Sequence, residues 1–142
     1  MRNSLTIGLI VAAFATAIGV MAGLTAGFLG GIPDRIITLI MDVFIVVPSL
    51  PILILMASLM QGRASIWVIC LILIIFNWPW PARQVRSIAL SMREREFINT
   101  ARFSGSSTFK ILTREILPYI FAWALANFVN TVLVAIATES GL

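Results

Sequence analysis

The sequence has no histidine and one cysteine, and each scarcity excludes a class of function. Without histidine, a GxxxxGK phosphate loop or a cluster of metal-ligand residues, the chain lacks the usual groups for acid–base, nucleotide or metal chemistry. The single cysteine, Cys70, excludes an internal disulfide, and its place in an apolar run indicates a small packing residue. We therefore expect no enzymatic activity, no cofactor and no metal, so any energy input must come from another chain.

Charge is also scarce: 11% of the residues are charged and 60% are hydrophobic. The mean hydropathy of +1.03 is far above that of soluble domains. Four uncharged runs cover residues 3–33, 43–62, 64–82 and 116–138, each near or above the roughly 20 residues that cross a bilayer as a helix. The sequence predicts an all-α, polytopic membrane bundle of about four transmembrane helices, in a single domain over residues 1–142.

The first expected span, about Leu5–Leu29, has three glycines at four-residue spacing on one helix face. Another helix can approach closely at such positions. We favour close packing inside the bundle over a role in lining a pathway, and we expect a short turn at residues 30–33. The three glycines are Gly19, Gly23 and Gly27.

The second expected span, about Ile36–Met60, contains two prolines and a carboxylate. Pro48 and Pro51 free backbone carbonyls and bend a membrane helix. Asp42 is a functional candidate, because a carboxylate inside a membrane has a high free-energy cost. We favour a structural ion pair with Arg35, seven residues back, or a capping role, over a place in a pathway.

The third span is expected at about Ile66–Ala82 and ends in tryptophans and prolines that are typical of an interfacial belt. The fourth, about Ile116–Thr138, carries Asn127 and Asn130 on one face. These amides either hydrogen-bond across helices, which we favour, or give a pathway a polar lining.

Residues 83–117 carry the whole net charge of +4, with seven Lys/Arg and three Glu, while the six charges elsewhere cancel. If this loop is cytoplasmic, so is the turn with Arg35, and that side holds eight positive residues against two. The count predicts a cytoplasmic loop and external termini. It also explains the basic balance better than nucleic-acid binding, so we expect no nucleic-acid partner.

Within this loop, residues 83–103 have an amphipathic helical pattern that Gly105 ends. Ser106 or Ser107 can cap a second short helix over residues 108–115, which Pro118 separates from the last span. The pattern predicts a two-helix knob with an apolar surface and an arginine rim, suited to a partner's groove. The alternative is a solvated loop on the lipid headgroups. The predicted apolar surface consists of Phe97, Ile98, Ala101 and Phe103.

This segment resembles the EAA loop of permease subunits of binding-protein-dependent ABC importers. The family's pattern is EAA, three residues, Gly, nine residues, two further positions, then Leu and Pro. REREF, REILP, AGFLGGIPDR and MDVFIVVPSL further resemble the C-type permeases of dipeptide and oligopeptide importers. The positions that the resemblance assigns to ATPase docking are Glu96, Asn99, Thr100, Ala101, Gly105, Leu117 and Pro118.

The resemblance implies a transmembrane subunit of an ATP-driven peptide importer that works by alternating access in a prokaryotic inner membrane. Its implied partners are a second permease subunit, two cytoplasmic ATPase subunits that bind the ATP, an extracytoplasmic substrate-binding protein and membrane lipid. Nickel and oligosaccharide importers share this permease type and stay open as alternatives.

The chain departs from the family in two ways. Asn99 replaces the family's glutamate, which weakens a charge-assisted contact with the ATPase by about 1 kcal/mol. Family members also usually have further helices before the first span and after the last, so we expect a fragment.

Two other classes of function compete with this interpretation. An ion-coupled secondary transporter would need intramembrane carboxylates, of which only Asp42 qualifies. A non-transporting scaffold would use the basic loop to bind anionic lipid.

Overall fold

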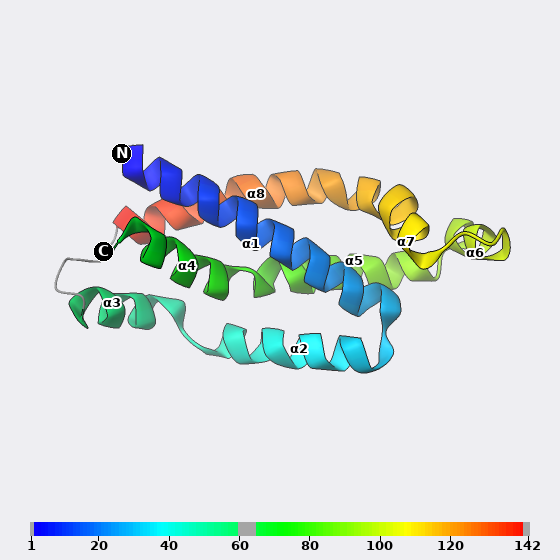
Figure 1. The fold of residues 1–142 in the computed structure, drawn as a ribbon, viewed down its shortest axis with the longest axis horizontal. Coiled ribbons are helices and arrows are strands. Elements are labelled where there is room, and N and C mark those ends of the chain that lie inside the picture. The colour runs from blue at the N-terminus through cyan, green and yellow to red at the C-terminus, as the bar shows by residue number, and fades with distance from the viewer. Residues whose placement is uncertain (1, 60–64, 141–142) are drawn as a thin grey trace.

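The computed structural model describes residues 2–59 and 65–140, which form a bundle of helices and, within these ranges, no strand (Figure 1). The all-α architecture is confirmed. The helices are α1 (Arg2–Leu29), α2 (Gly31–Val46), α3 (Ser49–Leu59), α4 (Ile66–Asn77), α5 (Pro79–Arg93), α6 (Glu96–Phe103), α7 (Thr108–Ile111), a π-helical turn η1 (Leu112–Ile116) and α8 (Leu117–Ser140).

Three helical stretches in the described part of the chain are long and apolar enough to cross a membrane: Leu5–Leu29, Ile66–Arg93 and Thr108–Val134. Helix α1 lies at the centre and packs against α2, α4, α5 and α8. This arrangement is a polytopic membrane bundle, as the composition predicts.

The second expected span is divided into α2 and α3. Val47 is extended (φ −77°, ψ 118°), because the ring of the following Pro48 disfavours the helical conformation in the residue before it. Neither piece alone reaches the length of a span, so a continuous helix over residues 36–60 was the wrong prediction. Its expected last residue, Met60, lies outside the described residues.

The glycine face of α1 lies directly against α5. A β-carbon added to Gly19 would lie 2.6 Å from the ring of a proline in α5, and one on Gly27 would lie 2.5 Å from the carbonyl oxygen of Arg86. On Gly23 it would overlap the carbonyl oxygen of Ala82. Only glycine allows the two backbones to come this close, which confirms the predicted close packing.

The amphipathic helix predicted over residues 83–103 is interrupted at Glu94 and Arg95. Its first part is the end of α5, which continues the third span, and its second part is α6. Arg95 is extended, so the chain changes direction before α6, and Ile98 is buried in a core cluster with Met92. The amphipathic pattern of residues 83–103 does not predict this break, and no Gly or Pro lies at it. In the structure, the break is accompanied by the burial of Ile98.

The second short helix of the loop does not end before Pro118, contrary to the prediction. Helix α7 continues through η1 into α8 without interruption. The wide turn lets the N–H of Leu117 bond to the carbonyl of Leu112, five residues back. The helix thus passes the proline, which has no N–H, by changing its hydrogen-bond spacing locally.

Candidate functional site

The candidate site consists of α6, the turn at residues 104–107 and α7, which we call the coupling surface. It forms one tip of the bundle, beyond the α1–α2 turn, while the beginning of α1 and the end of α8 lie at the opposite end (Figure 1). Gly105 adopts a positive φ of 77°, which favours glycine. Ser107 caps α7 by accepting a hydrogen bond from the N–H of Lys110 at 3.4 Å. The coupling surface is therefore a compact protrusion with a glycine at its turn.

The structure gathers most of the motif positions on this protrusion. Glu96, Asn99 and Thr100 are exposed on α6, Ala101 is half-buried and Gly105 is exposed in the turn. The other two lie on a different element: Leu117 and Pro118 begin α8, and Leu117 lines an apolar groove between α1 and α8.

The apolar part of the coupling surface differs from the prediction. Ile98 is fully buried, and Phe97 stacks on Tyr119 of α8 with ring centroids 5.9 Å apart, so neither is a free contact residue. Phe103 is 92% exposed and Phe109 of α7 is 76% exposed. Of the four predicted residues Phe103 is thus exposed as expected, and the exposed apolar surface consists of Phe103 and Phe109, one on either side of the turn.

An arginine also fastens α6 to the rest of the bundle. The guanidinium carbon of Arg102 lies 5.0 Å from the ring centroid of Phe28, near the end of α1, as a cation–π contact. Phe97 holds the same helix to α8 through Tyr119. Because α6 is tied to two long helices, a force on it acts on both.

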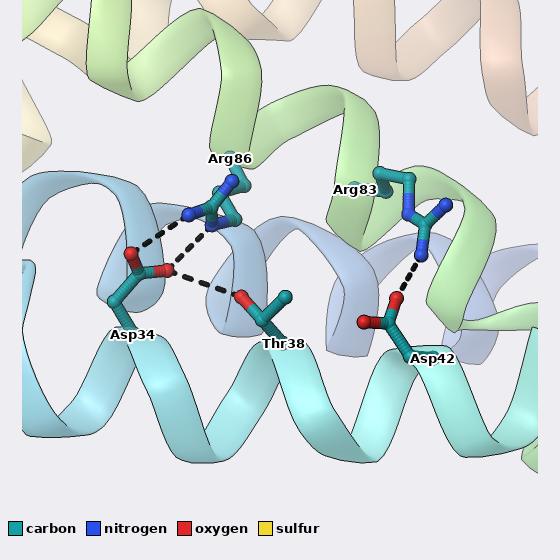
Figure 2. Close-up of polar contacts among 5 residues, drawn as sticks. All are labelled: Asp34, Thr38, Asp42, Arg83 and Arg86. Atoms are coloured by element: carbon teal, nitrogen blue, oxygen red, sulfur yellow. Dashed lines mark hydrogen bonds and ion pairs between the residues drawn. The ribbon is translucent and has the colours of Figure 1, made fainter.

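Helices α2 and α5 are joined by two ion pairs, which we call the charge ladder (Figure 2). Arg86 donates two hydrogen bonds to Asp34, from Nε at 2.5 Å and from Nη2 at 2.7 Å, and Thr38 donates a third at 3.2 Å. Arg83 pairs with Asp42 one rung along. Asp42 is thus in a structural ion pair, but the predicted partner Arg35 was wrong, because the antiparallel α5 brings Arg83 opposite it.

The hydrogen bond from Arg86 holds the pKa of Asp34 below its ordinary value, against the opposing effect of burial. A lowered folded-state pKa adds stability above the ordinary carboxyl pKa and loses it as the pH falls through the folded value. The ion pair of Asp34 with Arg86 therefore stays ionised at neutral pH, and its full contribution to folding stability is present there.

The two asparagines of the last span have different surroundings. Asn127 donates a hydrogen bond to Thr16 of α1 at 3.2 Å, which links two helices. Asn130 is exposed. Both line a polar pocket of about 320 Å³, so the structure gives Asn127 an interhelical contact and places both amides at a cavity.

Residues 19–142 match the family of the binding-protein-dependent transport system inner membrane component. The chain belongs to this family. It is 33% identical over its whole length to the oligopeptide transport system permease protein OppC of Mycobacterium tuberculosis (strain ATCC 25618 / H37Rv), covering 49% of that protein. It is 36% identical over 121 residues, 84% of the chain and 34% of the relative, to the dipeptide transport system permease protein DppC of Lactococcus lactis subsp. cremoris (strain MG1363).

A third relative of this family member is the oligopeptide transport system permease protein OppC of Bacillus subtilis (strain 168). It is 33% identical over 142 residues, 99% of the chain and 46% of the relative. The chain spans about half the length of the curated relatives it matches. The resemblance drawn from the EAA-like spacing is confirmed at the level of the family, which consists of transport-system components and not of enzymes.

Sequence reasoning missed two features of this family member. One is the rung between Asp34 and Arg86, although the AGFLGGIPDR segment that contains Asp34 was singled out. The other is the exposure of Phe109, because a four-residue helix gives no periodicity from which to read its outer face.

Proposed function

We propose that the chain is part of the transmembrane permease subunit of an ATP-driven peptide importer in a prokaryotic inner membrane. The family supports a transport component, and relatives matched over most of the chain are named as oligopeptide and dipeptide permeases. A second permease subunit would complete the pathway, and an extracytoplasmic binding protein would deliver the peptide. Nickel or oligosaccharides remain the alternative cargo of the same permease type.

The observation that carries this proposal is the attachment of the coupling surface. Helix α6 protrudes from one end, yet Arg102 fastens it to α1 and Phe97 fastens it to α8. We infer that two cytoplasmic ATPase subunits pull on such protrusions and that the rigid attachment turns closure of the ATPases into reorientation of the spans. Phe103 and Phe109 would enter an apolar groove of the ATPase, with the nearby basic residues around it.

The charge ladder bears on the rival functions. A gradient-driven transporter needs a carboxylate that is free to exchange a proton or ion, whereas Asp42 is paired with Arg83 and Asp34 with Arg86. A lipid-binding scaffold would present its basic residues along the membrane plane. The coupling surface instead projects along the bundle axis, as Figure 1 shows, which favours a partner beyond the membrane.

Crosslinking tests the docking directly. Cys70 is the only cysteine and is buried, so Cys70→Ala gives a background for Thr100→Cys on α6. In the assembled transporter we expect Thr100→Cys to crosslink to the ATPase subunit through a short bismaleimide. Leu39→Cys, at a 66% exposed position on α2, is the matched control and should not react with the ATPase. Equal crosslinking of both, or of neither, would contradict the assignment.

A second test uses the turn of the coupling surface. Gly105→Pro forces φ to about −65°, which the observed value of 77° cannot accommodate, so ATP hydrolysis should continue while peptide uptake falls at least severalfold. Gly31→Pro imposes the same conflict at φ 62° in the α1–α2 turn, away from the coupling surface. Uptake in vesicles that stays coupled in Gly105→Pro, or an identical loss in both variants, would argue against a special role for this turn. A bulky substitution at Ala101, a half-buried residue of α6, should act in the same direction as Gly105→Pro.

A further inference from the structure

A polar pocket lies where two helical segments of the bundle are interrupted at the same level. Ser49 begins α3, directly after the break between α2 and α3, and Asn77 ends α4, directly before the junction with α5. Both line the pocket of about 320 Å³, with α8 as its third wall. The principal lining residues are Ser49, Asn77, Trp80, Asn127, Asn130 and Thr131.

The lining of this pocket is neutral and rich in hydrogen-bonding groups. None of the described residues that line it is charged. Two of its amides already have donor roles within the bundle, because Asn127 donates to Thr16 at 3.2 Å and Asn77 donates to the carbonyl of Leu73 at 2.7 Å. Asn130, by contrast, is exposed, and its side chain has no hydrogen-bond partner among the described residues. An unpaired carboxamide at membrane depth is costly, which favours an external partner for it.

Prolines leave additional hydrogen-bond acceptors, in the form of backbone carbonyls, near the polar pocket. Pro79 and Pro81 have no N–H, so the carbonyls four residues before them, in Ile75 and Asn77, lack their helical donors. Pro48 has the same effect at the break between α2 and α3. The interrupted level of the bundle therefore has the carboxamide of Asn130 and backbone carbonyls that lack helical donors.

Resting on the proposed function, we propose that this pocket is a contact site for the main chain of the transported peptide, with Asn130 and Ser49 as its contact residues. A carboxamide matches a peptide bond, since each has an N–H donor and a carbonyl acceptor. A neutral lining accepts peptides whatever the charge of their side chains. The volume lies at the lower end of the roughly 300–1,000 Å³ of ligand pockets, so the site holds a short stretch of main chain at a time.

The test uses the complete transporter in proteoliposomes, with Asn130→Leu and Ser49→Ala compared with Val129→Leu. Val129 is exposed on the same helix but does not line the pocket. Losing one hydrogen bond should raise the half-saturating peptide concentration about two- to tenfold in the first two variants. The shift should be equal for a neutral and a basic tripeptide, and Asn130→Gln should restore most of the affinity.

A labelling measurement adds a readout that a purely structural role would not change. In a Cys70→Ala background, Asn130→Cys should react with a small maleimide, and saturating tripeptide should slow that reaction during turnover. If the wild-type complex takes up peptide while both pocket variants match it and Cys labelling is unaffected, the pocket assignment is overturned and the proposed function stands. A shift for only one of the two tripeptides would also overturn main-chain recognition. A wild-type complex that takes up no peptide would instead defeat the proposed function, and this inference with it.

Discussion

Helix α5 has α1 on one side and α2 on the other, and the two contacts are built in opposite ways. Toward α1 the contact consists of backbone against backbone, with Gly23 against Ala82 and the buried Val85, and Gly27 against Arg86 and the buried Ala89. Toward α2 the contact consists of the charge ladder, whose four side chains extend across the space between the helices (Figure 2).

The two contacts fix different properties of α5: one fixes its distance from α1, and the other fixes its register along α2. The contact of Gly19, Gly23 and Gly27 with α5, which we call the glycine seam, sets how close α1 and α5 lie, because an added atom has no room. The seam contains no charged group that must lie opposite a partner. The ladder tolerates small changes in distance through long arginine side chains, yet each charge must lie opposite its partner. The distance of α5 from α1 is therefore set by the glycine seam, and its alignment with α2 is set by the charge ladder.

The largest effect is expected at the glycine seam. Alanine at an open helical position is usually about 0.5–1 kcal/mol more stable than glycine, but at Gly23 its β-carbon overlaps the backbone of α5, and such overpacking costs about 1–3 kcal/mol. Gly23→Ala should thus lower the thermal midpoint of the chain in detergent, followed by reaction of the buried Cys70 thiol with a fluorogenic maleimide.

Gly8→Ala is the matched control for that substitution. Its added β-carbon would lie 3.0 Å from the side-chain Cγ1 of Ile136 and 3.2 Å from the carbonyl oxygen of Val132, whereas at Gly23 it would lie 2.4 Å from the carbonyl oxygen of Ala82. The control should therefore lose less stability. A higher midpoint for Gly23→Ala would show that the seam has room, and the contrast with the ladder would disappear.

The inner rung should give an intermediate effect. The side chains of Asp34 and Arg86 are 18% and 29% exposed, and Asp34→Asn removes the charge that accepts two hydrogen bonds from Arg86 and one from Thr38, at a cost of about 1–2 kcal/mol. The exchange Asp34→Arg with Arg86→Asp should recover part of this loss in the same thiol assay. Strictly additive single and double changes would mean that the two residues do not act as a pair.

The smallest effect is expected at the outer rung. Arg83 and Asp42 are 47% and 52% exposed, and exposed ion pairs contribute about 0–1 kcal/mol. Asp42→Asn should therefore lower the midpoint less than Asp34→Asn under identical conditions. A larger loss for Asp42→Asn would reverse the order of the rungs and point to a role for Asp42 beyond pairing.

Several local features were predictable because they depend on neighbouring residues alone. The four-residue spacing of the glycines predicted the close packing of α1 on α5, and Ser107 was among the predicted caps of the short helix. The length of the apolar runs predicted the span at Leu5–Leu29 and the start of the third span at Ile66, but that span continues to Arg93, beyond the predicted end at Ala82. Pro48 predicted a bend, and the structure has a complete break there. The family followed from motif spacing, which survives substitutions such as Asn99 for glutamate.

The sequence pattern within one helix did not predict which side chains of other helices each residue contacts. Asp42 has Arg35 on its own helix face, yet it pairs with Arg83, 41 residues away, because α5 returns antiparallel to α2. The outward surface of α6 was assigned from its apolar residues, but Ile98 is buried against helices that are distant in sequence.

The sequence by itself determined that this chain is an apolar, all-helical membrane protein of a transport family, since hydropathy, glycine spacing and the EAA-like motif are properties of the chain alone. Only the tertiary structure decided which carboxylate meets which arginine, that Phe109 joins Phe103 at the exposed tip while Ile98 is buried, and that two helix interruptions meet at one polar pocket. The physical reason is that pairing and exposure depend on how helices far apart in sequence align, and the pattern within each helix is compatible with more than one alignment.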